Sequence, residues 1–188
     1  YTVQMDYFID GESTPLVDAK EFTVTLLDNT VLPAEDREAK IKFQRDVATL
    51  QGEISSYSRI LSEISDKIKY FEVAVLRLER PIEELSSQMK KVKDDLRDIN
   101  ILFYGDNVKR RLDMQQIPTP SSRVGIIANE EKYSTASPTG THVNSLKIAK
   151  EEFVPLKSRV DMLVENVKSI EDKMKSLGAP YTPGRYEN

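Results

Sequence analysis

The sequence contains no cysteine and no tryptophan, and it has a single histidine, His142. The lack of cysteine excludes disulfides and thiolate chemistry. It leaves the compartment open, because many secreted bacterial proteins also lack cysteine. A zinc site would have to be built almost entirely from carboxylates, whereas zinc sites in proteins favour cysteine and histidine. We therefore expect no metal site and no cofactor, and we expect His142 to be a surface residue of a polar loop.

Long apolar runs and an excess of positive charge are also missing. No apolar run approaches the ~20 residues that a membrane-spanning helix needs. The net charge is −4 over 188 residues, so no basic surface indicates binding to nucleic acid or to an anionic membrane. Hydrophobic residues make up 39% and charged residues 31%, a balance typical of long amphipathic helices with wide solvated faces. The expected partners therefore include neither nucleic acid nor a membrane.

Motifs that carry catalysis are absent from the sequence. There is no GxSxG, no phosphate-binding loop, no HExxH and no GxGxxG. Carboxylates are abundant, but they occur in runs such as EDREAK and KKVKDDLRD, which are typical of solvated helix faces. We expect Tyr104, Tyr133 and Tyr181 to cover the ends of a core rather than to contact a partner. The sequence names no catalytic, cofactor-binding or metal-binding residue, and it predicts that this chain is not an enzyme.

The first 27 residues alternate between apolar and polar side chains, which predicts β-strands. Asp10 and Gly11 form the strongest short hairpin signal in the chain. A second alternating run, from Phe22 to Leu26, is predicted to be the next strand. Two or three strands alone are marginally stable in water. We therefore interpret residues 1–30 as the terminal strands of an Ig-like β-sandwich; the alternative is a small β-ribbon packed on the helices.

Apolar residues then recur every three or four positions, which predicts long helices with a coiled-coil-like seam. Acidic residues 35–36 suit the start of the first helix. One stripe runs from Phe43 to Phe103, and a second runs from Leu146 to Leu177 straight through Pro155. Gly178 is expected just after the end of the last helix.

Pro81 lies within the first stripe and leaves three interpretations open. A single rod from Glu35 to Phe103 would be about 100 Å long, and the last helix supplies a partner for only about half of it. Pro81 could instead be the first residue of a second helix, where its missing N–H has no cost. A turn between Lys69 and Glu72 would give three helices of matched length, although no Gly or Asn marks it.

The fold class that follows is mainly α: an antiparallel three-helix coiled-coil-like bundle preceded by a short β-hairpin that ends a β-sandwich. The bundle is expected over residues 31–179, with a long loop at residues 104–142 and a C-terminal tail at residues 180–188. Within that loop, a short helix is predicted to start at Ser121 or Ser122. Its apolar residues, expected to pack on the bundle, are Val124, Ile127 and Tyr133.

Four short stretches occur in an order that resembles a known family. They are YTVQMDYFIDGE, IPTPSSRV, SPTGTH and GAPYTPGRYEN. The chain resembles the C-terminal region of large secreted bacterial proteins with sortilin-like BNR (Asp-box) propellers, which are often described as glycosyl hydrolases. The resemblance implies a secreted, periplasmic or cell-surface location, and it implies that the propeller and any catalytic site lie outside this fragment. No site residue of that family maps onto a position here.

Two function hypotheses remain. The first is a non-catalytic C-terminal structural or interaction module of a larger secreted propeller protein, which docks on its own upstream propeller and sandwich domains or on a protein partner. The second is a self-associating coiled-coil adaptor or scaffold. The predicted strands favour the first, because a plain coiled coil rarely begins with a hairpin.

Overall fold

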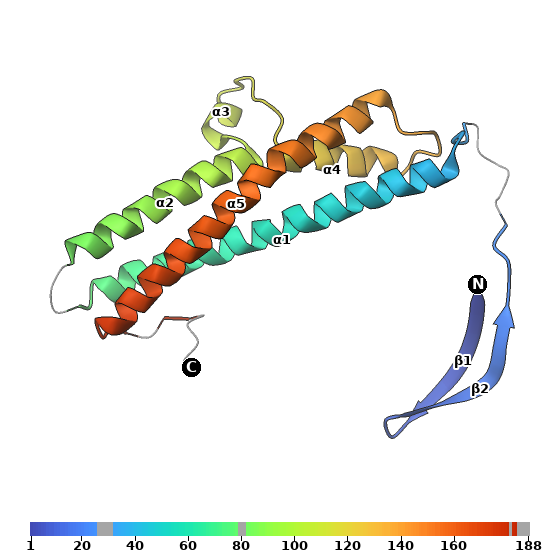
Figure 1. The fold of residues 1–188 in the computed structure, drawn as a ribbon, viewed down its shortest axis with the longest axis horizontal. Coiled ribbons are helices and arrows are strands. Elements are labelled where there is room, and N and C mark those ends of the chain that lie inside the picture. The colour runs from blue at the N-terminus through green and yellow to red at the C-terminus, as the bar shows by residue number, and fades with distance from the viewer. Residues whose placement is uncertain (26–31, 79–81, 181, 184–188) are drawn as a thin grey trace. The chain divides into compact units, whose positions relative to one another are not determined.

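A computed structural model describes residues 1–25, 32–78, 82–180 and 182–183 of the chain. The protein is mainly helical after an N-terminal β-hairpin (Figure 1). It divides into two units, Tyr1–Pro33 and Ala34–Asn188. Within the described residues, no helix combines the length and the apolar character that a membrane span requires.

The first unit is a two-stranded antiparallel hairpin of β1 (Thr2–Ile9) and β2 (Glu12–Glu21). The predicted turn is confirmed: Asp10 and Gly11 both have positive φ, 51° and 87°. Asp-Gly suits this two-residue turn, whose twist matches that of the strands. The predicted position of the second strand is wrong, because so tight a turn makes pairing begin at Glu12. The strand ends at Glu21, and a further backbone hydrogen bond runs from the Phe22 N–H to the Tyr1 carbonyl at 2.8 Å.

The second unit begins with α1 (Arg37–Val75), whose N-cap is Asp36. The Asp36 carboxylate accepts a hydrogen bond of 2.9 Å from the Ala39 backbone N–H, as expected for an acidic helix start. The next helix is α2 (Glu83–Tyr104), which ends at Gly105 with a positive φ of 85°.

Helix α2 runs antiparallel to α1, since Lys93 contacts Glu72 and, further along α2, Tyr104 contacts Ser58. A continuous rod is therefore wrong. A turn at residues 69–72 is also wrong, because that stretch lies within α1. Pro81 itself lies outside the described residues.

The predicted loop at residues 104–142 contains two helices, α3 (Asn107–Arg111) and α4 (Pro120–Glu131). The N-cap of α4 is Thr119 rather than Ser121 or Ser122, because Pro120 occupies the first helical position, where no N–H is needed. Val124 and Ile127 are buried, as predicted. Tyr133 is 76% exposed, so the prediction that it packs on the helices is wrong.

The last helix, α5 (Gly140–Ser176), continues through Pro155 as the sequence indicated. It runs parallel to α1 with a constant offset of 104 residues. The pairs that show this offset are Asp46–Lys150, Glu53–Lys157, Tyr57–Asp161 and Lys67–Glu171. Gly178 has a φ of 69°, and the Ala179 N–H donates to the Met174 carbonyl at 3.0 Å. Together with the bond from the Gly178 N–H to the Lys175 carbonyl, this hydrogen bond forms a Schellman motif, and Gly178 follows the helix end as predicted.

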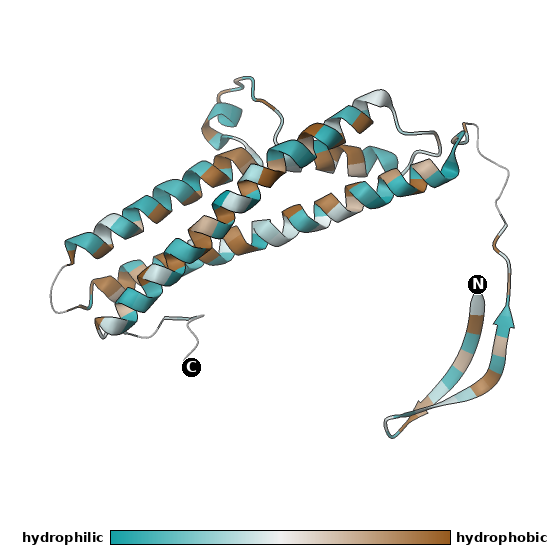
Figure 2. Cartoon of the chain, in the orientation of Figure 1, coloured by the Kyte–Doolittle hydropathy of each residue, from teal (hydrophilic) through white to brown (hydrophobic). Residues whose placement is uncertain are grey.

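Helices α1, α2, α4 and α5 pack around one core (Figure 2). Glu72 of α1 contacts α2, whereas Gln44 of α1 contacts the end of α4, so α2 and α4 lie beside different parts of α1. The predicted seams supply nearly all of the core, and Ala74 is buried where Val75 was expected. The largest fully buried side chains are Phe71, Phe103, Phe153, Leu61, Leu85, Ile99, Ile127, Leu163 and Met174.

Candidate functional site

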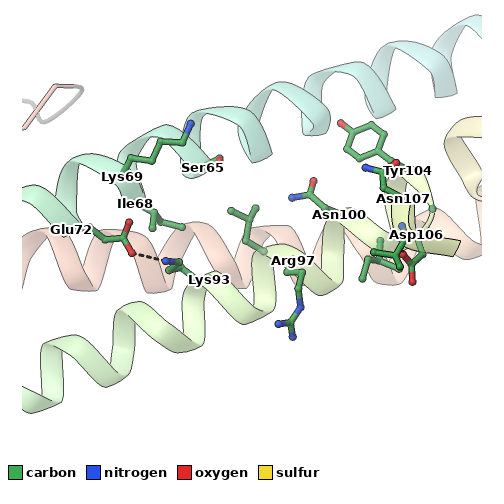
Figure 3. A pocket seen from close by; sticks show the side chains of 14 residues that line it. Ser65, Ile68, Lys69, Glu72, Lys93, Arg97, Asn100, Tyr104, Asp106 and Asn107 are labelled. Carbon is green, nitrogen blue, oxygen red and sulfur yellow. Dashed lines mark hydrogen bonds and ion pairs between the residues drawn. The ribbon is translucent and has the colours of Figure 1, made fainter. Parts of the chain in front are cut away.

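A cleft of about 790 Å³ lies between the C-terminal part of α1 and the C-terminal part of α2 (Figure 3). Its size is within the range of small-molecule sites. Ile68 and Leu96 are buried residues that line it, and Ser65 and Asn100 are half-buried polar residues beside them. The far end is closed by Tyr104 and the residues that follow it.

The cations of this cleft are already paired with carboxylates. Lys93 donates to Glu72, as the dashed line in Figure 3 marks. Arg97 pairs with Asp94 and Asp98 at 3.2 Å. Lys69 pairs with Asp66, and the hydrogen bond that its ammonium donates to the Asp66 carboxylate raises the pKa of Lys69. The cleft thus offers hydrogen-bonding groups and an apolar base, but its positive charges are neutralised by carboxylates of the same two helices.

Tyr104 closes the cleft in the way that the sequence suggested for an aromatic residue at a core end. Its ring lies 5.6 Å from the ring of Phe103, and its hydroxyl is hydrogen-bonded to Ser58. Ser58 therefore serves as a contact between α1 and the end of α2. Tyr181 lies outside the described residues.

A second cleft, of about 700 Å³, lies where the end of α2 and the connection to α4 meet α5. It is more apolar than the first, and Leu102, Ile117 and Leu156 line it. At its rim, Glu152 lies 3.7 Å from the Arg123 guanidinium. Within the described residues, Nε of Arg123 and Oε2 of Glu152 are buried and have no hydrogen-bond partner.

His142 occupies a different environment from the one predicted. It lies in the first turn of α5 rather than in a loop, and its side chain is only 15% exposed. Nδ1 is 2.8 Å from a carboxylate oxygen of Glu131, and Nε2 is 2.7 Å from one of Glu130. The hydrogen bond to Glu131 is the main cause that raises the pKa of His142, and Glu130 adds to it, while burial opposes both. His142 therefore links the start of α5 to the end of α4.

Lys40 of α1 contacts the connection between α4 and α5, residues 132–139. This residue is buried, and its ammonium donates to the backbone carbonyls of Ser134 and Ala136, the latter at 2.8 Å. Nearby, the Gln44 side chain donates to the Glu131 carbonyl at 3.2 Å. A buried ammonium is tolerated here because carbonyl oxygens replace its hydration. The polar groups at this end thus fasten a connection that has no regular structure.

Comparisons with family models, with curated proteins and with solved structures found no match to this chain. The resemblance to the propeller proteins therefore stays a prediction. Within the described residues, no group of three or more metal-binding side chains is arranged to hold an ion.

Lys40 and Glu131 were missed by sequence reasoning, although a signal for both is present. Lys40 lies three residues before Phe43 and seven before Val47, so it continues the seam of α1. Glu131 follows Val124 and Ile127 at the same spacing on α4. A charged residue at a seam position is the signal that could have marked this end of the molecule, because burial of a charge requires dedicated partners.

Proposed function

We propose that this chain is a non-catalytic structural and interaction module of a larger secreted propeller protein, located in the periplasm, at the cell surface or outside the cell. Its helical unit is an antiparallel three-helix coiled-coil-like bundle formed by α1, α2 and α5. Its hairpin belongs to a β-sandwich whose other strands lie upstream in the same protein. The observation that carries this proposal is the exposure of every residue of β1 and β2.

One face of strand β1 in the exposed hairpin is apolar. Residues directly opposite each other on paired strands share a face, and Met5 lies opposite Val17. Val3, Tyr7 and Ile9 lie on the same side of β1 as Met5, because alternate residues share a face. The β2 residues opposite Val3, Tyr7 and Ile9 are polar or charged, so the exposed apolar surface is a row along β1 that Val17 widens at Met5. Exposed apolar surface gathered on one face is typical of an interaction site. Stacked sheets bury such faces against each other at about 10 Å, which is the arrangement in a sandwich.

The two strands differ in their suitability for further pairing. The register is irregular on either side of Met5, and in both places β2 carries the extra residue. β2 also contains Pro15, which has no N–H to donate. Bulges and proline are features that protect a sheet edge from another strand. We therefore assign β2 to the edge of the sandwich sheet and the outer edge of β1 to pairing with the upstream strand.

A binding experiment tests this assignment. The chain is mixed with the separately produced upstream region of its protein, and complex formation is measured by calorimetry. Met5→Lys should weaken the complex strongly, because it places a charge in the apolar face. Gln4→Lys is the matched control. Gln4 lies on the opposite face, where its side chain donates to the Asp6 carboxylate at 2.8 Å. This change should alter the dissociation constant by no more than about twofold.

Two outcomes would contradict the proposal. Light scattering of the chain alone should give the mass of a monomer, and a stable dimer or filament would favour the self-associating coiled-coil scaffold instead. Turnover of a glycoside or peptide substrate, abolished by a single carboxylate change such as Glu72→Gln, would overturn the non-catalytic assignment.

A further inference from the structure

The end of the helical unit where α4 meets α5 contains an arrangement that the proposed function does not use. His142 lies between two carboxylates that approach its two ring nitrogens, Glu131 at Nδ1 and Glu130 at Nε2. A neutral imidazole has one N–H and one acceptor nitrogen, and an ionised carboxylate can only accept. Both contacts are hydrogen bonds only when both nitrogens carry a proton. With both carboxylates ionised, the geometry therefore favours an imidazolium.

The two carboxylates differ in how much they depend on that charge. Glu130 is exposed and can be solvated by water. Glu131 is 4% exposed, and its second oxygen, Oε2, is buried without a hydrogen bond from the described residues. Loss of the imidazolium charge would leave a buried carboxylate with one neutral partner at most, and a buried charge without compensation is costly.

We propose that His142, Glu130 and Glu131 form a pH-operated clasp, which fastens the connection between α4 and α5 while the ring is doubly protonated and releases it when the ring becomes neutral. The connection covers residues 132–139. When the clasp opens, this segment remains attached to α1 through Lys40, so the change is local rather than global unfolding.

The charged groups around the ring have opposing effects. From α4, Glu130 and Glu131 favour the imidazolium. From α5 itself, the positive end of the helix dipole disfavours it, since His142 lies in the first turn. From α1, Lys40 lies at this end of the helical unit, where its ammonium donates to two backbone carbonyls. Lys132, at the end of α4, lies over the ring of Tyr133, 5.2 Å from its centroid.

The direction of the pH response follows from the raised pKa of His142. A histidine whose folded-state pKa is above its unfolded value contributes stability that is complete below the unfolded value, about 6.5. That contribution is lost as the pH rises through the folded-state value. The clasp is thus closed in mildly acidic solution and opens on the alkaline side of 6.5.

The sequence offers a direct measurement, because His142 is the only histidine in the chain. Its imidazole proton resonance in the full chain needs no assignment and can be followed by NMR as the pH is raised. We expect a pKa above 6.5 in the wild-type protein. Glu131→Gln should lower it most, Glu130→Gln should lower it less, and Glu151→Gln, a change on the exposed surface of α5, should leave it unchanged. A wild-type pKa at or below 6.5 would overturn the proposal.

Amide hydrogen exchange of residues 132–139 tests whether titration opens the connection. His142→Gln is compared with the wild-type chain at equal pH, so that intrinsic exchange rates cancel. The variant should exchange faster below the pKa of His142, and the ratio should approach one above it. Each unit by which the pKa is raised corresponds to about a tenfold change in the opening equilibrium. Equal exchange in both proteins at every pH would show that the histidine fastens nothing, and this comparison stays decisive if Glu131→Gln fails to fold.

Discussion

The hairpin and the helical unit use similar apolar side chains with opposite results. Val3, Met5 and Ile9 are all exposed, whereas Val160, Met174 and Ile170 are all buried. The difference lies in what each element faces, because the two-stranded hairpin has no partner for its apolar face within the first unit, while each long helix lies against others. The spacing of apolar residues thus indicates which face of a strand or helix is suited to burial. Whether that face is buried depends on whether another element of the same unit packs against it.

The largest effect that would sharpen this comparison comes from the core. Leu163→Ala and Leu61→Ala should each lower the free energy of unfolding by ~2–5 kcal/mol, because they remove buried methyl groups and leave a cavity. Urea denaturation followed by circular dichroism at a helical wavelength measures the change. The exposed controls Lys90→Ala and Glu165→Ala should cost less than about 0.5 kcal/mol. If the leucine variants were as mild as the controls, these helices would not share the core described above.

A smaller effect is expected at the buried ammonium of Lys40. Lys40→Met keeps the apolar stem but leaves the carbonyls of Ser134 and Ala136 without this donor. We expect a loss of about 1–3 kcal/mol in the free energy of unfolding, as for buried acceptors left unpaired. Lys42→Met is the matched control, since Lys42 is exposed on the same helix. A loss equal to that of the control would mean that water replaces the ammonium without cost.

The smallest effect should come from the hairpin. Ile9→Thr removes an exposed apolar side chain from the first unit, which has no share in the core of the second. Helical unfolding should therefore change by less than about 0.5 kcal/mol. A change as large as that of a core leucine would erase the distinction between the two units.

The sequence predicted the long helices well because the spacing of their apolar residues and the residues at their ends indicate the same helices. The seams of α2 and α5 are buried almost residue for residue, and Gly105 and Gly178 end these helices with positive φ. The turn at residues 69–72 was wrong because nothing in that stretch interrupts a helix. Likewise, alternation alone placed the second strand at Phe22, whereas the two-residue turn fixed the pairing at Glu12.

The polar end of the helical unit could not be predicted from spacing in the same way. His142 reaches Glu130 and Glu131 because residues 132–139 turn the chain back, and the path of an irregular connection depends on packing rather than on pattern. The stretch STASPTGTH, residues 134–142, is typical of a loose loop. Yet Lys40 and the Glu35 backbone N–H donate hydrogen bonds to residues within it, and His142 at its end contacts Glu131. Glu35 and Lys40 are about one hundred positions away from the residues they contact, and local sequence patterns do not predict contacts over that separation.

The constant offset between α1 and α5 has a consequence for how this chain can change over evolutionary time. The pairs from Asp46–Lys150 to Lys67–Glu171 mark the alignment of the two helices, whose buried seams share one core. The length of the chain between them does not set that alignment. Residues added or lost in the irregular stretch between α3 and α4 would change the offset of 104 residues, but the same side chains of α1 and α5 would stay in contact. A change of length there would leave the alignment of α1 and α5 intact, whereas a single residue inserted within α5 would rotate every later side chain by about 100° and misalign the core.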